Sequence, residues 1–213
     1  DSRLIGNIGN PALSEKKITK KTIFVIEASS YQLEYSQIFT SKYEVILNIT
    51  PEHIERHKNL KNYINAKFKI IKNQLKEDYA ILNMNNPYIK QEIKTKKFSS
   101  KLIKIYKYLD IKFLKKINNP YFYREGNREN LSFVFAIAKI LKLKKSNLFK
   151  TLKKFKGLKY RQQVIFKSKN LTIINDSKST SFSSSVSILK LMSNVYWIVG
   201  GLAKKGDKFL LQK

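Results

Sequence analysis

An alternation of short β-branched-rich runs with segments of helical apolar spacing is the feature that most constrains the fold. Three runs, TIFVIE (22–27), YEVILNI (43–49) and YAILNM (79–84), have the length and composition of buried parallel strands. Between the last two, residues 60–75 repeat apolar side chains at helical spacing. The members of this stripe are Leu60, Tyr63, Ile64, Phe68, Ile71 and Leu75. The pattern predicts an α/β fold with a mostly parallel sheet.

The rest of the chain continues with further strand and helix patterns. Expected strands lie at 101–106 (KLIKIY), 121–125 (YFYRE), 163–166 (QVIF), 171–175 (LTIIN) and 195–201 (VYWIVGG). Expected helices lie at 127–141, 146–155 and 182–192. The pattern changes from helical to strand-like runs after the helix that ends at 155. We therefore expect a domain boundary near Lys156–Gly157.

A strongly basic composition raises the question of a nucleic-acid partner. The chain has 43 Lys and Arg against 15 Asp and Glu, a formal net charge of +28, and lysines can neutralise nucleic-acid phosphates. The lysines are spread along the chain, however, and no arginine-rich arm or aromatic RNA-binding signature accompanies them. We interpret them as solvated surface lysines and expect no nucleic-acid partner. A basic nucleic-acid-binding protein stays as the alternative from a different class.

Cysteine usage and hydropathy exclude other classes. The chain has no cysteine, which excludes disulfides, thiolate metal sites and cysteine nucleophiles. No apolar run approaches the roughly 18 residues of a membrane span, and no signal peptide opens the chain. We expect a cytoplasmic protein without a membrane partner.

Both histidines of the chain lie four residues apart in NITPEHIERH. A zinc pair would need two further protein ligands, and no cysteine or third histidine exists to supply them. Glu27 and His53 each follow a predicted strand of one sheet, at the edge where open α/β sheets place ligand groups. They could share a hard cation such as magnesium, with phosphate oxygens and water as the other ligands. We interpret His57 as a packing or hydrogen-bonding residue.

Several further motifs follow or precede strands, and taken in order they resemble the Mur ligase family. The matching stretches are GNIGNPAL, EASSYQLE, ILNITPEHIERH, YINAKFKI, GNRENLSFVFAIA, GLKYRQQV, NDSKSTS and GGLAKKGDKF. They cover essentially the whole chain. NDSKST is the most discriminating, because it resembles the members that add D-glutamate, whereas other members typically carry a tyrosine after the Asp. Another Mur-type ligase or a folylpolyglutamate synthetase is the alternative within this class.

The resemblance implies a fold and an extent. It implies a three-layer α/β central ATP-binding domain over residues 1–156, incomplete and with a mostly parallel sheet. The start of a Rossmann-like C-terminal domain would follow over 157–213. The family's glycine-rich phosphate loop is not in this sequence. We therefore expect an internal fragment, inactive alone, of a protein that is a monomer at full length.

The resemblance also implies an activity and the residues that carry it. The expected reaction is an ATP-dependent amide ligation in peptidoglycan synthesis, in which the carboxylate of UDP-N-acetylmuramoyl-L-alanine is phosphorylated and D-glutamate attacks the acyl phosphate. Glu27 and His53 match the family's magnesium positions. Lys67 matches the lysine that becomes carbamylated, and a carbamate can help to hold a second Mg²⁺. Lys67 and His53 are thus the expected catalytic residues.

The remaining matches are substrate and nucleotide positions. Asn7 matches a substrate-binding asparagine. The nucleotide-binding matches are Asn127, Asn130, Arg161 and Asp176, and the D-glutamate side is matched by Lys178, Thr180 and Lys204. The chain departs from the family at three places: no histidine precedes Asn127, and the family's common residues are replaced by Tyr160 and Ser181.

Overall fold

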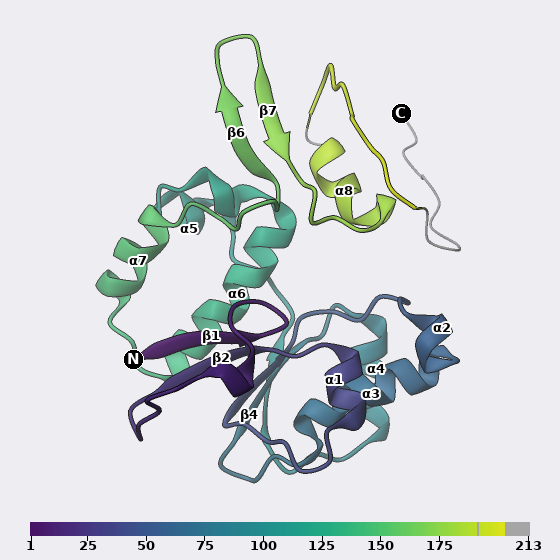
Figure 1. The fold of residues 1–213 in the computed structure, drawn as a ribbon. Helices are drawn as coiled ribbons and strands as arrows, with labels where there is room; N and C mark the ends of the chain where they lie inside the picture. Colours follow the sequence, from purple (N-terminus) through teal and green to yellow (C-terminus); the bar gives the residue numbers. More distant parts are fainter. Residues whose placement is uncertain (191, 203–213) are drawn as a thin grey trace. The chain divides into compact units, whose positions relative to one another are not determined.

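A computed structural model describes residues 1–190 and 192–202 of the chain (Figure 1). The chain divides into two compact units, unit 1 (Asp1–Tyr106) and unit 2 (Lys107–Lys213). The boundary expected near Lys156–Gly157 falls inside unit 2. The division into domains 1–156 and 157–213 therefore stays a prediction about the complete protein.

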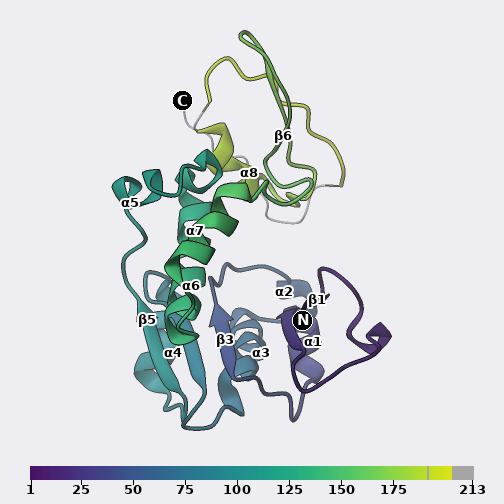
Figure 2. The same ribbon diagram turned by 90° about the vertical axis from the view of Figure 1, so that its left-hand side faces the viewer.

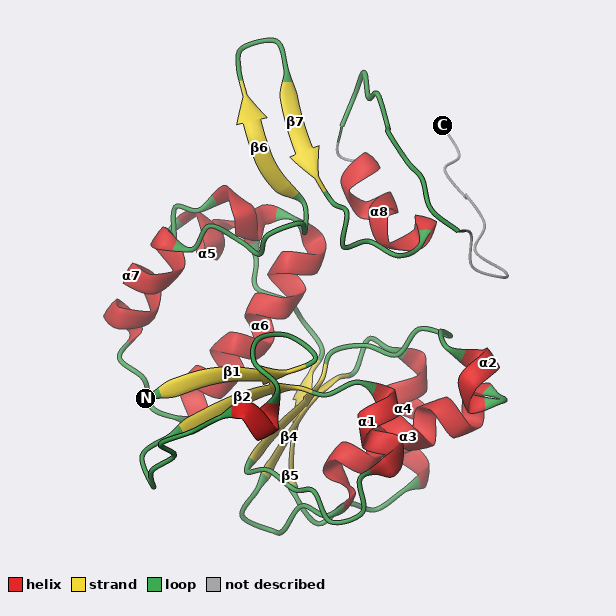
Figure 3. Cartoon of the chain, in the orientation of Figure 1, coloured by secondary structure: helices red, strands yellow, loops and turns green. Residues whose placement is uncertain are grey.

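Unit 1 contains two parallel sheets. The first pairs β1 (Ser2–Gly6) with β2 (Ile23–Glu27), and the second has the order β3 (Tyr43–Ile46), β4 (Tyr79–Asn83), β5 (Lys101–Ile105). Figure 3 shows these strands in yellow, with helices beside them. The expected parallel pairing is confirmed, but the expectation that β2 and β3 belong to one sheet is wrong. The expected burial of β2 is also wrong, because Ile23, Val25 and Ile26 are 62%, 57% and 40% exposed. Apolar composition located the strand without identifying its neighbours or its burial.

Unit 1 has four helices, of which α3 and α4 pack on the three-stranded sheet. The helices are α1 (Ser30–Tyr35), α2 (Ile54–His57), α3 (Leu60–Lys72) and α4 (Pro87–Thr95), and a 3-10 turn, η1 (Ala12–Ser14), lies between β1 and β2. Both α1 and α2 pack on α3. The ribbon views show α3 and α4 alongside this sheet (Figure 2), and α3 packs on β3 as α4 does on β4. Three consecutive residues of β4 have no exposed surface: Ala80, Ile81 and Leu82. Burying each large aliphatic side chain contributes about 1.5–3 kcal/mol.

The apolar stripe predicted for α3 is confirmed over most of its length. Its buried members are Tyr63, Ile64, Phe68 and Ile71. Leu75 was expected on the same stripe but is 59% exposed. The helix ends at Lys72 with Asn73 as its C-cap, so the helical spacing no longer places Leu75 against the sheet. None of the described helices is long and apolar enough to cross a membrane.

Unit 2 is mainly helical, with one hairpin. Its elements are α5 (Ile111–Lys115), η2 (Pro120–Tyr123), α6 (Glu125–Ile140), α7 (Lys145–Lys154), β6 (Gln163–Lys167), β7 (Thr172–Asn175) and α8 (Phe182–Leu189). The helices predicted at 127–141, 146–155 and 182–192 are confirmed within a few residues. The runs QVIF and LTIIN form the antiparallel pair β6–β7.

Two strands predicted in unit 2 are wrong. YFYRE forms η2 and the start of α6, because Asn119 accepts a hydrogen bond from Tyr121 N–H and Pro120 is suited to a first helical turn. VYWIVGG forms no strand among the described residues. No described strand pairs with this run. Its side chains are accordingly exposed, with Tyr196 and Ile198 each at 98%.

Candidate functional site

The turn after β1 brings two expected site residues together. Gly6 has φ +102°, and a Cβ there would lie 2.5 Å from the Glu27 carbonyl oxygen. Only glycine therefore allows the turn to pass so close to β2. Asn7 N–H donates to the Glu27 carbonyl at 2.8 Å, and Asn7 Nδ2 donates to Glu27 Oε1 at 3.2 Å. The asparagine and the carboxylate, predicted from separate motifs, thus form one contact.

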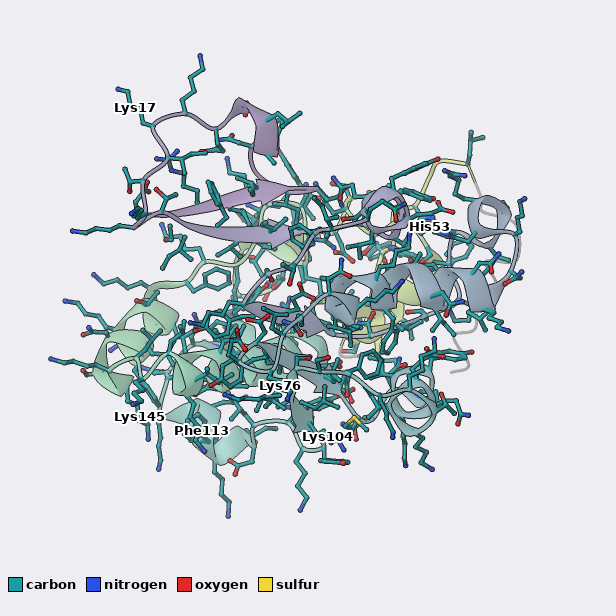
Figure 4. The ribbon with its side chains drawn as sticks, turned by 90° about the horizontal axis from the view of Figure 1, so that it is seen from below. Lys17, His53, Lys76, Lys104, Phe113 and Lys145 are labelled. Atoms are coloured by element: carbon teal, nitrogen blue, oxygen red, sulfur yellow. The ribbon has the colours of Figure 1, made fainter. Side chains whose placement is uncertain are left out.

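His53 occupies a strained backbone position at the start of α2. It is the N-cap residue of that helix, with φ 57° and ψ 29°, in the left-handed region. A residue other than glycine in this region costs of order 1–3 kcal/mol and persists only where its surroundings hold it. The His53 ring lies 5.0 Å from the Tyr31 ring, measured between centroids. Figure 4 labels His53 among the side chains.

His57 is the more deeply buried histidine of the two. Its side chain has no exposed surface. Its Nε2 lies 3.0 Å from Ser30 Oγ, and its ring is stacked on Tyr31 at 5.6 Å with an interplanar angle of 13°. The ring of Tyr63 lies 5.4 Å away on a tilted plane. The interpretation of His57 as a packing and hydrogen-bonding residue is confirmed.

Lys67 lies one helical turn beyond Tyr63 on α3. Its Nζ is 5.3 Å from the centre of the Tyr63 ring, close enough for a cation–π contact. Burial lowers the pKa of Lys67, and the negative charge of Glu52 acts in the opposite direction. Burial raises the pKa of Tyr63 to about 12, with further contributions from Glu52 and Tyr31. Lys67 therefore lies inside the same ring cluster and not in free solvent.

The residues expected to hold magnesium fit a hard cation by their chemistry. Glu27 is a half-buried carboxylate at the carboxyl end of a parallel strand, and magnesium usually takes one or two such protein ligands with phosphate and water. Within residues 1–190 and 192–202, no group of three or more His, Cys, Asp or Glu side chains gathers as a metal cage. The donor set thus suits a cation that is completed by substrate oxygens.

In unit 2, the expected nucleotide residues of α6 lie at its start. Asn127 Nδ2 donates to the Tyr121 carbonyl at 2.8 Å, and this contact fixes the amide at the junction of η2 and α6. Asn130 is exposed one turn further along, on the same face because residues three apart are neighbours on a helix. Arg124, the N-cap residue of α6, donates to the Gln162 carbonyl at 3.1 Å.

The carboxylate of Asp176 joins the two loops that carry the other expected residues of unit 2. Its Oδ1 accepts from Gln162 N–H at 2.9 Å, next to the exposed Arg161. Its Oδ2 accepts from Ser179 Oγ at 2.7 Å and from Ser185 Oγ at 3.3 Å. The motifs GLKYRQQV and NDSKST are therefore held together by one side chain.

The residues expected to face D-glutamate lie after β7. Lys178 N–H donates to the Tyr160 carbonyl at 3.0 Å, and the side chains of Lys178 and Thr180 are exposed. Lys204 lies outside the described residues. A hollow of about 280 Å³ elsewhere in unit 2 is lined by Lys116, Lys145, Ser146 and Phe149. Lys145 Nζ is 5.5 Å from the Phe113 ring (Figure 4), and none of the expected site residues lines this hollow.

Sequence reasoning missed the aromatic residues that organise the histidines. Tyr31 contacts both His53 and His57, and Tyr63 contacts His57 and Lys67. Tyr31 lies in EASSYQLE, one of the stretches that match the family, but its position gives no sign that it contacts residues more than 20 positions later. The signal available was one large aromatic ring in a motif that is rich in polar residues.

Comparisons with known proteins agree with the fold and the motifs. A family profile described as the Mur ligase middle domain matches residues 5–116. The proteins named UDP-N-acetylmuramoylalanine--D-glutamate ligase from Rickettsia felis and Rickettsia bellii are 36% and 33% identical to the chain over 97% of its length. The corresponding protein of Caldanaerobacter subterraneus is 30% identical over 96%. The chain spans about half the length of these relatives, 48–50%.

A solved structure supports the fold alone. The crystal structure of MurF from Acinetobacter baumannii matches 80% of this chain and 42% of its own, with a TM-score of 0.58 and 16% sequence identity. Together with the parallel sheets of unit 1, this likeness confirms the α/β fold expected from the alternation of strands and helices.

Proposed function

The chain belongs to the Mur ligase family, and from this membership we propose that the complete protein is an ATP-dependent ligase that adds D-glutamate to UDP-N-acetylmuramoyl-L-alanine in peptidoglycan synthesis. The observation that carries the proposal is the similarity to relatives named as D-glutamate ligases over nearly the whole chain. The motif NDSKST also supports D-glutamate as the amino acid that is added. The reaction proceeds through an acyl phosphate, so it needs ATP, two substrates and cations in one place.

In this proposal, Mg²⁺ is held by Glu27 at the end of β2 and by His53 at the start of α2. The cation supplies charge stabilisation for the transferring phosphoryl group when it is bound. Asn7 orients the Glu27 carboxylate, because its amide donates to Oε1. Asn7 is also proposed to bind the substrate.

Lys67 acts as a carbamate in the proposed mechanism. Only a neutral amine adds to CO₂, and the burial that lowers the pKa of Lys67 increases the neutral fraction. Carbamylation replaces a cation by an anion, which can hold a second Mg²⁺. Before it loses its proton, the Lys67 ammonium is held in the cluster by its contact with the Tyr63 ring.

The residues of unit 2 are proposed to hold nucleotide and amino acid. Asn127 and Asn130 present two amides on one face of α6, and Arg161 presents a guanidinium suited to phosphate. Asp176 holds the loop of Arg161 to the loop of Lys178 and Thr180. Lys178, Thr180 and Lys204 provide cationic and hydroxyl donors for the side-chain carboxylate of D-glutamate.

A ligation assay of the complete protein tests the proposal. Phosphate release from ATP is measured with UDP-N-acetylmuramoyl-L-alanine and, in separate reactions, D-glutamate, L-glutamate, a diamino acid or D-Ala-D-Ala. Of these amino acids and peptides, we expect only D-glutamate to cause phosphate release. Release with another amino acid, or with a folate acceptor and L-glutamate, would assign the protein to another Mur-type ligase or to a folylpolyglutamate ligase.

A salt titration separates the ligase from the basic nucleic-acid binder. Lys17, Lys76 and Lys104 occupy separate places on the surface of unit 1 (Figure 4), which supports a diffuse charge. We expect weak, sequence-independent DNA and RNA binding, and we propose that the complete protein is a cytoplasmic monomer without a nucleic-acid or membrane partner. Tight binding with a steep dependence on salt would contradict this.

A further inference from the structure

We propose that His57 is a positioning residue, which holds Tyr31 against His53 and so fixes the imidazole expected to bind magnesium. The inference deepens the proposed function and rests on it for the role of His53. It concerns a residue to which the resemblance assigns no task. It stands on a set of contacts within unit 1, all between described residues.

A continuous series of ring contacts links the two expected metal-side residues through His57. His53 contacts Tyr31 at 5.0 Å, and Tyr31 is stacked on His57 at 5.6 Å. His57 contacts Tyr63 at 5.4 Å, and Lys67 lies over the Tyr63 ring at 5.3 Å. His57 is the middle member, so its ring orientation affects both ends of the series.

Three hydrogen bonds fix His57 in place. Its Nε2 is bonded to Ser30 Oγ of α1, 27 residues earlier. Its carbonyl accepts from Asn62 Nδ2 of α3 at 3.0 Å, and its N–H donates to the His53 carbonyl at 3.1 Å. The residue thus ties together α1, α2 and α3, the three helices that carry the cluster.

The neighbouring carboxylate indicates which tautomer His57 adopts. His57 Nδ1 is 3.9 Å from Glu34 Oε2, and both atoms are buried without a hydrogen bond within the described part of the chain. A lone pair on Nδ1 would face a carboxylate oxygen, whereas an N–H would be attracted to it. Nδ1 therefore carries the hydrogen, and Nε2 accepts from Ser30 Oγ–H. The hydrogen bond to Ser30 therefore orients the imidazole, and the Glu34 carboxylate, which also pairs with Arg56 at 3.4 Å, lies on its other side.

Packing alone does not explain a histidine here. A buried polar group without its hydrogen bonds costs about 1–3 kcal/mol, while a phenyl ring would fill similar space at no such cost. What the imidazole adds over an apolar ring is a fixed orientation about its own axis. That orientation is passed to Tyr31 by the near-parallel stack, at 13° between planes.

The strained backbone of His53 needs neighbouring contacts to hold it, and the orientation of Tyr31 supplies one of them. A left-handed residue other than glycine needs its surroundings to hold it, and His53 has φ 57°. The Tyr31 ring holds its side chain, and the His57 N–H holds its carbonyl. Residues that orient a metal ligand typically change metal affinity or activity by about 10–100-fold when they are removed.

Manganese affinity of the complete protein is the first measurement, with Mn²⁺ as the spectroscopic probe for the magnesium site. We expect His57→Ala to weaken Mn²⁺ binding by about 10–100-fold. His57→Phe keeps a ring in the stack, so its affinity should fall between those of His57→Ala and the parent. Phe68→Leu alters another buried ring of α3 and is the matched control, with the parent's affinity expected. Parent-like affinity in His57→Ala would overturn the inference.

Tyr31→Leu provides a second variant in case His57→Ala does not fold, because Tyr31 is 36% exposed and its truncation is milder. If His57 acts through Tyr31, the double variant should lose no more Mn²⁺ affinity than the weaker-binding single variant. Additive losses would mean that the two residues act independently, and would overturn the inference.

A metal-free readout separates this inference from the proposed function. The ¹H–¹³C ring signals of His53, assigned by their loss in His53→Ala, should shift in both His57→Ala and Tyr31→Leu and stay unchanged in Phe68→Leu. Unchanged His53 signals in His57→Ala would overturn the positioning role even in an active ligase. A parent without D-glutamate-dependent ligation would refute the proposed function, and the His53 signals would still decide the positioning role.

Discussion

The two units hold their candidate residues in different ways. In unit 1, the rings of Tyr31 from α1 and Tyr63 from α3 contact the buried ring of His57. The expected residues His53 and Lys67 contact this cluster at its two ends. In unit 2, one half-buried carboxylate, Asp176, holds two loops whose other expected side chains are exposed. Rings that interlock resist movement because every displacement opens a gap. Hydrogen bonds at the surface can exchange with water, so we expect unit 1 to keep a preformed site and unit 2 an adjustable one.

The largest effect should come from Lys67, at one end of the rigid cluster. In the complete protein, Lys67→Ala should reduce ligation by about 10²–10³-fold, the loss typical of one electrostatic group at a reacting centre. A small carboxylic acid added to the assay should restore part of the activity, because it can replace the missing carbamate. Lys61→Ala removes an exposed lysine of the same helix and should have parent activity. Normal turnover of Lys67→Ala would remove Lys67 from the mechanism.

A buried carboxyl in the sheet of unit 1 makes the rigid unit sensitive to pH. Burial raises the pKa of Glu44 to about 8, while Ser41 opposes the shift and Asp78 adds to it. Because the folded state holds this proton more tightly than the unfolded state, the stabilising effect is fully present below about pH 4.5 and is lost as the pH rises through about 8. The free energy of unfolding should fall by about 3 kcal/mol by pH 7 from this group.

Glu44→Gln is the variant that isolates this effect. The amide keeps an oxygen that can accept from Ser41 N–H, as Glu44 Oε1 does at 2.9 Å, and it does not titrate. Chemical denaturation at pH 5 and pH 8 should show a smaller difference for Glu44→Gln than for the parent. Glu77→Gln changes an exposed carboxylate and should follow the parent. An equal pH dependence in Glu44→Gln and the parent would contradict the prediction.

Asp176 tests the adjustable unit. Asp176→Ala leaves Gln162 N–H without its acceptor and should cost about 1–3 kcal/mol of local stability. The expected result is faster amide hydrogen exchange across residues 157–162, with protection of α6 retained. Asp110→Ala removes another carboxylate that accepts a backbone N–H, at the start of α5, and should leave 157–162 as protected as in the parent. If both variants accelerated exchange there equally, Asp176 would have no special role.

The parts of the fold that could be predicted are those in which local pattern and burial agree. The stripe of α3 and the runs of β3 and β4 are apolar because they face the interior, and their positions followed from spacing. The run of β2 was also located by its composition, although Ile23, Val25 and Ile26 are exposed. The strand β1 was missed because SRLIG is short and contains Arg3, whose guanidinium bonds Asp1, Glu15 and two backbone carbonyls. YFYRE was misassigned because capping by Asn119 outweighed the strand preference of its aromatic residues.

The site residues were identified through family resemblance, and their surroundings could not have been. Ser30 and His57 are 27 residues apart, and no local rule states that two helices will bring them within 3.0 Å. Asp176 was expected to contact nucleotide, and its hydrogen bonds to Gln162, Ser179 and Ser185 were not foreseen. Contacts of this kind depend on how the elements pack, which periodicity does not encode.

The smallest expected effect concerns the serine N-caps, which occur in both units. Ser29 caps α1 and Ser181 caps α8, each with a reciprocal hydrogen-bond pair to the third residue of its helix. Removing either hydroxyl should cost about 1 kcal/mol of helix stability, because one N–H of the first turn loses its acceptor. In unit 1 the cap precedes Ser30 and Tyr31 directly, so loosening it also loosens the ring stack. Ser29→Ala should therefore shift the His53 ring signals as well as lower the unfolding free energy, whereas Ser181→Ala should lower the stability of α8 without changing His53. Unshifted His53 signals in Ser29→Ala would mean that the ring stack holds itself without the cap, and that unit 1 is more rigid than we propose.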